Sequence, residues 1–446
     1  MASLVSLRRL LLSLAAVVAV VVMPLGVVSA SAQTTPSPRA AVCWHACWVS
    51  GWAAAPSDGL SIVDARLVPF LHGPEQTLRM IITPHYGGSV VRVRLTNRFG
   101  IAPVTFHDVA IAHSESGAAL VADSSRPVLF EGKRSVTVSA GRDVVSDPVA
   151  FTVQAFDNLA VSLYPDGVLL PTEHFAGRQV SYGTLPGAGD HVIDPTGLAF
   201  VQTTTARYFV HGLDVRAGGD AGTVVTFGDS LTDGYQSGPT GIPETISTLN
   251  INARYPDWLA RRLLAEHIPL SVANAGIYGN QILRNGSLPF SGPSGLSRFR
   301  ADVIDQPGVR TVLILLGTND IGTGNATPAQ IISGLEQLIA MARDAHLRVL
   351  LGTLTPMKNA TSPTYAGAGP NATREAVNAW IRTQHVADGY IDFARAVGDP
   401  SNPDIIAPEY DGGDGLHFSP AGYRAMANAV PLDALCGPVC ARQTAP

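Results

Sequence analysis

The strongest constraint on the fold is a rhythm in the second half of the chain, where short apolar runs alternate with amphipathic helical patterns. The apolar runs lie at residues 223–227, 270–275, 311–317, 348–353 and 390–393. Between several of them apolar residues recur at helical spacing, most clearly in residues 328–342, where Thr327 stands at the cap position and Pro328 at the first helical position. Residues 255–264 and 419–430 have similar patterns. This alternation predicts a parallel sheet covered by helices on both faces.

The first half of the chain has a different rhythm, because apolar and polar residues alternate there with a period near two. Short β-rich runs of this kind lie at residues 89–96, 135–138, 150–153 and 159–164, and pairs of turn-forming residues separate them. Many short strands at regular spacing predict a β-sandwich.

The first residues, 1–32, have the pattern of a secretory signal peptide. An arginine pair precedes an apolar run at residues 10–23, and a small-residue cleavage site, Ala-Ser-Ala, ends at Ala32. An uncleaved membrane anchor is the alternative, because the run can be extended to Val28, but Pro24 and the small-residue ending favour cleavage. No later segment has the charge-free apolar length of a spanning helix, so we expect no stable membrane insertion after cleavage.

The predicted organisation has five parts. They are a signal peptide (1–32), a lead (33–47), a β-sandwich domain (48–215), a linker (216–222) and an α/β domain (223–446). The formal net charge is −5 and 15% of the residues are charged, with no cluster of Lys and Arg. We therefore expect an exported protein with no nucleic-acid partner; the oligomeric state is left open.

Four cysteines lie in two pairs near the ends of the chain, Cys43 with Cys47 and Cys436 with Cys440. Four thiols allow three pairings, and the sequence does not choose among them. A zinc site with four cysteine ligands is the alternative at this spacing. The oxidising exterior favours disulfides, so the cysteines are interpreted as structural.

A serine that follows the first predicted strand of the α/β region is the first candidate for chemistry. Residues 224–235 are VVTFGDSLTDGY, and Ser230 fits either a helix cap, in a capping box with Asp233, or a nucleophile. Further polar residues follow other predicted elements of this region, at 274–280 (NAGIYGN), 317–320 (GTND) and 414–417 (DGLH). In a parallel sheet these segments are expected along one rim, where ligands bind.

Together these segments contain the parts that acyl transfer needs. Ser230 is predicted to attack the carbonyl carbon, His417 to accept its proton and Asp414 to orient the imidazole. The backbone amides of Ser230 and Gly279 and the side-chain amide of Asn319 are predicted to surround the oxyanion. Gly279 and Asn319 also suit ordinary turns, but the order of all these residues at strand ends favours catalysis.

The motifs resemble those of SGNH hydrolases, also called GDSL esterases and lipases. The four blocks are Gly228-Asp-Ser-Leu231, Asn274-x-Gly-x-x-Gly279, Gly317-Thr-Asn-Asp320 and Asp414-x-x-His417, and the resemblance covers residues 223–430. It implies a flavodoxin-like three-layer α/β/α sandwich that needs no metal or organic cofactor, and the same catalytic and oxyanion residues. Phe418 stands where many members have proline, which puts in doubt how the His417 loop is held.

Residues 48–56 and 91–100 are similar to the β domain of secreted bacterial GDSL proteins in the xylan-esterase-like branch. This resemblance implies a secreted enzyme, free or wall-associated, that removes short acyl groups such as acetate from a polysaccharide or a small ester. The alternatives are a lipase or phospholipid acyl hydrolase, and an inactive exported carbohydrate-binding protein. Trp44, Trp48 and Trp52 fit either glycan-binding or core positions.

Overall fold

The computed structural model describes residues 47–59, 70–166, 171–236 and 248–436. The predicted signal peptide, Cys43, Cys440 and Trp44 lie outside these residues, so export and disulfide pairing stay predictions. The described residues all belong to one compact unit, and the predicted domain boundaries stay predictions within it. Among the described residues, no helix has the length and apolar character needed to cross a membrane.

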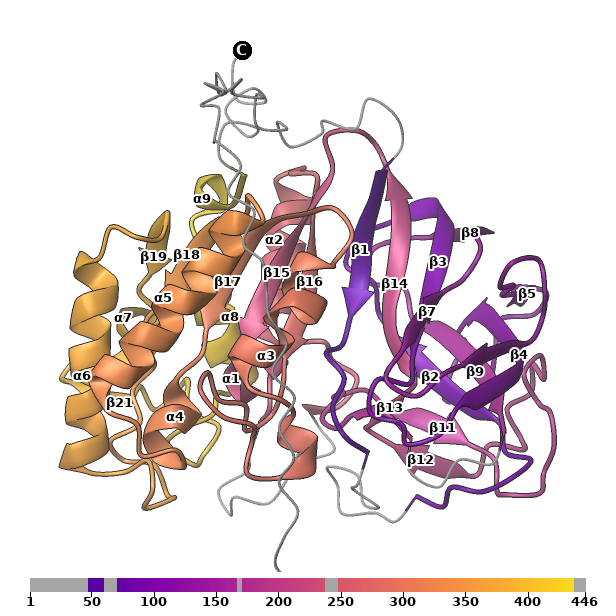
Figure 1. Cartoon of the computed structure of the whole chain (residues 1–446), viewed down its shortest axis with the longest axis horizontal. Helices are drawn as coiled ribbons and strands as arrows, with labels where there is room; N and C mark the ends of the chain where they lie inside the picture. Colours follow the sequence, from indigo (N-terminus) through magenta and orange to yellow (C-terminus); the bar gives the residue numbers. More distant parts are fainter. Residues whose placement is uncertain (1–46, 60–69, 167–170, 237–247, 437–446) are drawn as a thin grey trace, which may run out of the picture. The chain divides into compact units, whose positions relative to one another are not determined.

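Antiparallel strands in two sheets occupy the chain as far as Ala217 (Figure 1). The strands of the first sheet are β1 (Cys47–Ala53), β3 (Gly88–Thr96), β7 (Asp143–Val145), β8 (Val149–Val153) and β14 (Val210–Ala217). The strands of the second are β2 (Leu78–Ile82), β4 (Val104–His113), β5 (Arg126–Pro127), β6 (Val136–Val138), β9 (Leu159–Pro165), β11 (Ser181–Gly183) and β12 (Gln202–Thr204). The order is β1-β14-β3-β7 in the first, with β8 on β3, and β12-β11-β2-β9-β4-β5 in the second, with β6 on β4. A short pair, β10 (Glu173–His174) and β13 (Arg207–Tyr208), lies apart from both sheets.

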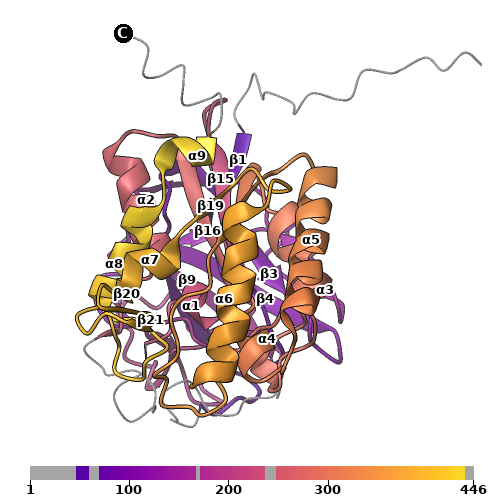
Figure 2. The same ribbon diagram turned by 90° about the vertical axis from the view of Figure 1, so that its left-hand side faces the viewer.

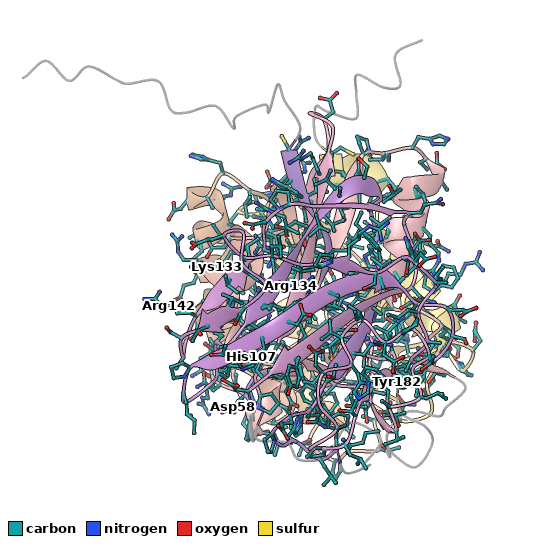
Figure 3. The ribbon with its side chains drawn as sticks, turned by 90° about the vertical axis from the view of Figure 1, so that its right-hand side faces the viewer. Asp58, His107, Lys133, Arg134, Arg142 and Tyr182 are labelled. Atoms are coloured by element: carbon teal, nitrogen blue, oxygen red, sulfur yellow. The ribbon has the colours of Figure 1, made fainter. Side chains whose placement is uncertain are left out.

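The two sheets share one hydrophobic core. Val93 of β3 belongs to the same buried cluster as Met80 of β2 and Val161 of β9. At the start of β4 the burial alternates, since Phe106 is buried whereas His107 is exposed, and Figure 3 shows His107 on the outer face of the sheet. These features confirm the predicted β-sandwich.

A parallel five-stranded sheet forms the centre of the second region. Its strands are β15 (Gly222–Gly228), β16 (Leu270–Gly276), β17 (Val309–Leu315), β18 (Arg348–Gly352) and β19 (Gly389–Ile391). They follow the order β16-β15-β17-β18-β19, and all four pairings are parallel. This is the flavodoxin-like strand order, and all five predicted strands are confirmed.

Helices cover both faces of this sheet (Figure 2). One group consists of α2 (Tyr255–Ala265), α7 (Phe393–Val397) and α8 (Pro420–Ala429), and the other of α3 (Gly295–Phe299), α5 (Pro328–Asp344) and α6 (Ala368–Thr383). The shorter elements are α1 (Ser230–Asp233), α4 (Thr318–Gly322), α9 (Leu432–Cys436), a 3₁₀ turn η2 (Pro289–Ser291), a π-helical turn η3 (Arg300–Ile304) and the hairpin of β20 (Gly398–Asp399) and β21 (Asn402–Ile406). Thr327 caps α5 through a capping box with Gln330 and Pro328 is the first helical residue, as predicted.

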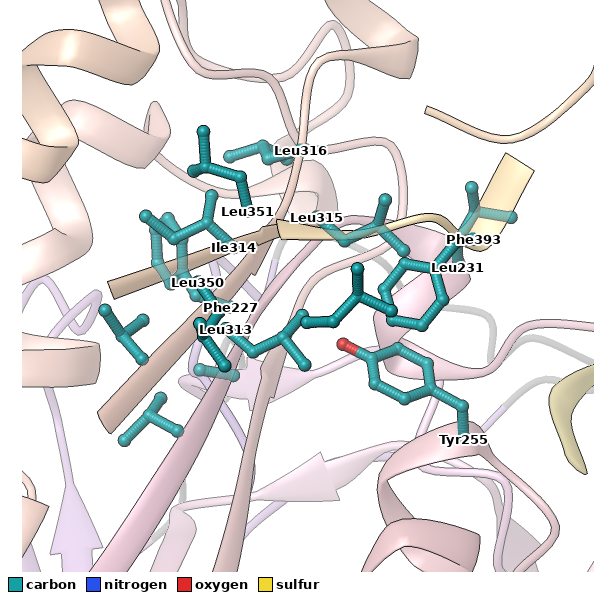
Figure 4. Close-up of a cluster of buried hydrophobic side chains, with 14 of the residues drawn as sticks. Phe227, Leu231, Tyr255, Leu313, Ile314, Leu315, Leu316, Leu350, Leu351 and Phe393 are labelled. Atoms are coloured by element: carbon teal, nitrogen blue, oxygen red, sulfur yellow. The ribbon is translucent and has the colours of Figure 1, made fainter. Parts of the chain in front are cut away.

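The centre of the parallel sheet is buried on both faces, as helices on both sides require. Phe227, Leu313 and Leu350 come from three neighbouring strands and are at most 1% exposed. Figure 4 shows them in one cluster with Tyr255 of α2 and Phe393 of α7. Because the strands are parallel, their carboxyl ends lie along one rim of this well-packed sheet.

The β-sandwich lies against the edge of this layer at β16, and polar contacts join the two. The Ser271 hydroxyl donates to the carbonyl of Ser50 in β1 at 2.6 Å, and the Ser50 amide donates to Oγ1 of Thr223 at 3.0 Å. His85 lies between the Val272 carbonyl and the Asp257 carboxylate, with 2.8 Å to each. The two regions are thus joined through buried hydrogen bonds.

Candidate active site

Ser230 is the first residue of α1, directly after the turn that ends β15. The preceding Asp229 is the N-cap, and its Oδ1 accepts a hydrogen bond from the amide of Leu231 at 3.0 Å. The interpretation of Ser230 as the helix cap is therefore wrong, because the strand ends one residue before the cap and Asp229 takes that place. The Ser230 hydroxyl is left to make a contact outside the helix.

That contact is with the imidazole of His417. Oγ of Ser230 lies 2.9 Å from Nε2 of His417, and Nδ1 of His417 lies 2.8 Å from Oδ2 of Asp414. Oδ1 of Asp414 accepts from the backbone amides of Leu416 and His417, at 3.0 and 2.8 Å. A carboxylate at Nδ1 favours the tautomer with its proton there, which leaves Nε2 as the acceptor for the serine proton.

The loop that carries His417 is held by Phe418, the residue at which the chain departs from the SGNH pattern. Phe418 is fully buried, and its ring makes an edge contact with Tyr423 of α8, with 5.5 Å between the ring centroids. The His417 carbonyl accepts from the amide of Gly412 at 2.8 Å. Packing and the backbone therefore fix this loop without a proline.

The two further oxyanion candidates lie beside the same serine. Gly279 has a φ of +71°, and a Cβ at this position would lie 2.5 Å from Oγ of Ser291, so both backbone and space favour glycine. Nδ2 of Asn319, on α4, donates to the carbonyl of Asn280 at 3.0 Å, and Oδ1 accepts from the Tyr365 hydroxyl at 2.7 Å. These two bonds orient the amide, whose second N–H remains for a ligand.

A cavity of about 280 Å³ brings all five predicted site residues together. Its lining consists of Ser230, Tyr235, Tyr278, Gly279, Ser287, Leu288, Ser291, Asn319, Thr323, Thr361, Ser362, Tyr365, Asp414, Leu416 and His417. Most of these side chains carry a hydroxyl group, and the only aliphatic ones are the two leucines. The cavity therefore combines a serine–histidine–aspartate arrangement with a wall that is rich in hydroxyl groups.

Comparison with known proteins supplies the family. Residues 226–425 match the model of the GDSL-like Lipase/Acylhydrolase family. This segment is a GDSL-like lipase/acylhydrolase domain. It contains all five site residues, and the resemblance to GDSL hydrolases is confirmed.

Several solved structures are similar to about half of this chain. Est24, a carbohydrate acetylesterase from Sinorhizobium meliloti, is 19% identical with a TM-score of 0.39, over 50% of this chain and 99% of its own. An aryl esterase of M. smegmatis is 21% identical with a TM-score of 0.39, over 48% of this chain and 100% of its own. A GDSL-like lipase from Bacteroides thetaiotaomicron is 18% identical with a TM-score of 0.35, over 48% and 87%. None of the curated proteins compared with this chain matches it.

Two buried carboxyl groups of the GDSL domain have raised pKa values. Burial raises the pKa of Asp229 to about 7, and its Oδ2 has no hydrogen-bond partner among the described residues. Burial also raises the pKa of Asp320 to about 6, although its two oxygens accept from the amides of Ile282 and Leu283 at 2.8 and 3.0 Å. Asp320 thereby ties α4 to the segment that follows Gly279.

Aromatic side chains surround one side of the cavity. The rings of Tyr235 and Tyr278 lie 5.0 and 6.4 Å from the imidazole of His417, centroid to centroid. Phe290 stacks on Phe175 of the β-sandwich region, at 4.1 Å and an interplanar angle of 15°. The β-sandwich therefore supports part of the surroundings of the GDSL site.

Sequence reasoning missed several of these residues. Tyr278 lies at a variable position of a predicted motif, whereas Tyr365 and Phe175 belong to segments with no recognisable signal. Of the tryptophans considered for glycan binding, Trp52 is buried in the sandwich core and Trp48 is partly covered by the guanidinium of Arg92 at 4.0 Å.

Metal chemistry has no evident site in the described part of the chain, where no three His, Cys, Asp or Glu side chains are grouped to hold an ion. The residues that line the cavity contain only one imidazole and one carboxylate.

Proposed function

We propose that this protein is a secreted serine ester hydrolase that removes short acyl groups, such as acetate, from a polysaccharide or a similar ester. The observation that carries the proposal is the hydrogen-bonded series from Ser230 through His417 to Asp414, at 2.9 and 2.8 Å, in the wall of one cavity. The family match of residues 226–425 supports the hydrolase class.

The reaction follows from this geometry. Oγ of Ser230 attacks the ester carbonyl carbon as its proton moves to Nε2 of His417, and the carbonyl oxygen becomes an oxyanion. The amides of Ser230 and Gly279 and the Asn319 side chain donate to that oxyanion. When the tetrahedral intermediate collapses, the alcohol leaves with the proton from Nε2 and the acyl group stays on Oγ. Water then attacks the acyl-serine with His417 as base, and the carboxylic acid departs as Oγ regains its proton.

The many hydroxyl groups in the wall of the cavity support a short acyl group. A buried methylene contributes about 0.8 kcal/mol only where apolar surface receives it, and hydroxyl-bearing side chains predominate here. The cavity volume of about 280 Å³ lies near the lower limit of the range of about 300–1,000 Å³ that ligand cavities span. Export and a polysaccharide substrate are supported by the signal-like pattern of residues 1–32 and by the xylan-esterase-like resemblance of the first half.

The nucleophile is tested with Ser230→Ala. We expect turnover of p-nitrophenyl acetate to fall on the order of 10⁴-fold or more, while the folded state is retained because alanine fits the same helical position. Ser333→Ala, on the exposed face of α5, is the matched control and should keep wild-type activity. Wild-type turnover by Ser230→Ala would refute the assignment of the nucleophile, whereas an absence of turnover in the wild-type protein would favour the inactive binding protein.

The substrate class is tested by product analysis. Incubation with acetylated xylan is expected to release acetate, whereas a phospholipid should release little fatty acid. A series of p-nitrophenyl esters should give the highest kcat/KM with acetate, and a maximum at long acyl chains would replace this proposal by the lipase alternative. Export is tested by sequencing the N-terminus of protein from the culture medium, which should begin at Gln33.

A further inference from the structure

One buried arginine contacts the segments that carry the catalytic groups. Arg298 lies in α3 with its side chain 2% exposed. Its Nη2 donates to the carbonyl of Gly228 and its Nη1 to that of Ala275, both at 2.8 Å. Its Nε donates to Oδ1 of Asn280 at 3.0 Å. All three guanidinium nitrogens are thus engaged with the ends of β15 and β16 and with the loop beyond β16.

These contacts lie next to the predicted oxyanion donors. Gly228 ends β15, two residues before Ser230, and Asn280 directly follows Gly279. The carbonyl of Asn280 in turn accepts the 3.0 Å bond from Nδ2 of Asn319. Arg298 therefore hydrogen-bonds to the segments that carry Ser230 and Gly279, and Asn280 connects it to Asn319.

An ion pair extends this arrangement into the β-sandwich region. Nη1 of Arg298 lies 3.1 Å from Oδ2 of Asp302, in η3, and Oδ1 of the same carboxylate accepts from Nη1 of Arg98 at 2.8 Å. Arg98 follows β3, and its second terminal nitrogen is hydrogen-bonded to Asp143 of β7. Two arginines therefore share one carboxylate, that of Asp302, whose side chain is only 3% exposed to solvent.

We infer that Arg298 is a positioning residue for the oxyanion donors, and that Arg98 of the β-sandwich region acts through Asp302 to hold it there. The inference rests on the proposed ester hydrolysis. Donors stabilise an oxyanion only when they are held in place before the charge develops, and a displacement of about 1 Å costs on the order of 100-fold in rate. The β-sandwich region thereby contributes to catalysis without touching the substrate.

Charge explains why an arginine rather than a neutral residue suits this place. Burial lowers the pKa of Arg298, and the neighbouring Asp302 opposes that effect. A planar guanidinium has several N–H donors in a fixed geometry, so one side chain can hold three separate backbone or side-chain acceptors in register. Loss of Arg98 leaves the charges of Asp302 and Arg298 buried with one partner fewer, so both side chains should move from their present positions.

The test uses Arg98→Met, because Arg98 is 21% exposed and its replacement keeps a long aliphatic side chain. The matched control is Arg92→Met; Arg92 is 24% exposed and pairs with Asp214 within the β-sandwich. Each enzyme is measured for kcat and KM with p-nitrophenyl acetate, for its thermal midpoint, and for inhibition by a boronic acid whose tetrahedral adduct places an oxygen among the oxyanion donors. A fluorophosphonate titration counts the working sites.

For Arg98→Met we expect kcat per working site to fall between about 5-fold and about 100-fold, boronate affinity to fall in parallel, and KM to change less than about twofold. For Arg92→Met we expect a lower thermal midpoint, with kcat and boronate affinity unchanged. Arg98→Lys restores the charge toward Asp302 and should recover part of the loss; it carries the test if the methionine variant does not fold. Wild-type kcat and boronate affinity in the folded Arg98 variants would overturn the inference. Ser230→Ala, measured in parallel, separates that outcome from a failure of the proposed function, because only the latter predicts that this variant stays active.

Discussion

The hydroxyl of Tyr365 donates a 2.7 Å hydrogen bond to Oδ1 of Asn319. Since Nδ2 of the same amide donates to the carbonyl of Asn280, the two ends of the Asn319 side chain are held by two different loops. The amide therefore cannot exchange its oxygen and nitrogen without losing both bonds. The second N–H of this amide lies in the same plane, so its direction as an oxyanion donor is set before substrate binds.

Tyr365→Phe tests this support. The ring should remain where it packs against Gly322, so only the hydrogen bond is lost. A neutral hydrogen bond contributes about 0.5–1.5 kcal/mol, which corresponds to a fall in kcat of about 2- to 12-fold, with a smaller change in KM. Steady-state kinetics with p-nitrophenyl acetate measure the effect. An unchanged kcat would show that Asn319 needs no help from Tyr365.

Asp414→Asn tests the orientation of His417. An amide at position 414 removes the negative charge that faces Nδ1, so the tautomer with an acceptor at Nε2 loses its support. We expect kcat to fall by as much as about 10⁴-fold near neutral pH. Asp411→Asn is the control, because Asp411 accepts from the amides of Gly413 and Gly415 in the same loop without contacting the imidazole. Equal losses in the two variants would mean that Asp414 serves only to hold the loop.

Phe175→Ala tests whether the β-sandwich region limits the acyl group. The Phe175 ring stacks on Phe290, which belongs to the segment that contributes Ser287, Leu288 and Ser291 to the cavity wall. An aromatic pair contributes about 0.5–1.5 kcal/mol beyond its buried area, so the wall should loosen without it.

We expect the ratio of kcat/KM for the octanoate ester to that for the acetate ester to rise on the order of 10-fold, as for a gain of about 1.4 kcal/mol. Phe175→Tyr keeps the stacking and should keep the wild-type ratio. If the alanine variant has lower stability but the same ratio, Phe175 is a structural residue with no influence on specificity.

The sequence predicts the α/β domain well because each of its signals is local. Thr327 and Pro328 mark the start of α5 as predicted, and the apolar runs become β15–β19. Polar residues placed directly after strands come together because parallel strands end at one rim. The positions of Ser230, Asn319 and Gly279 at this rim are therefore predictable from the sequence.

What the sequence does not predict depends on contacts between distant segments. Tyr365 reaches the cavity, and Arg98 reaches Asp302, through loops whose course no local pattern specifies. The helix α6 is absent from the predictions because Gly369 and Pro370, in its first turn, are typical of loops. The sequence allows Ser230 as the helix cap because serine and aspartate both suit that position. The end of the preceding strand decides for Asp229.

Asp229→Asn tests the cost of the buried carboxyl group next to Ser230. Burial raises the pKa of Asp229 from 3.8 to about 7, so the folded protein holds this proton more tightly than the unfolded chain does. Below about pH 4 both states are protonated and the group does not favour either. As the pH rises toward 7 the unfolded chain releases the proton first, and the free energy of unfolding falls. The difference of about three pH units corresponds to a loss on the order of 4 kcal/mol.

An asparagine still accepts the amide of Leu231 at the cap, but it does not titrate. The free energy of unfolding of Asp229→Asn, relative to wild type, should therefore rise between about pH 4 and about pH 7. Urea denaturation at several pH values in this window measures it. Asp305→Asn, at a carboxylate that is 54% exposed, is the control and should follow the wild-type curve. Parallel pH dependences of Asp229→Asn and wild type would show that this carboxyl group is ionised in the folded protein throughout the window, with its negative charge offset by groups other than the Leu231 amide.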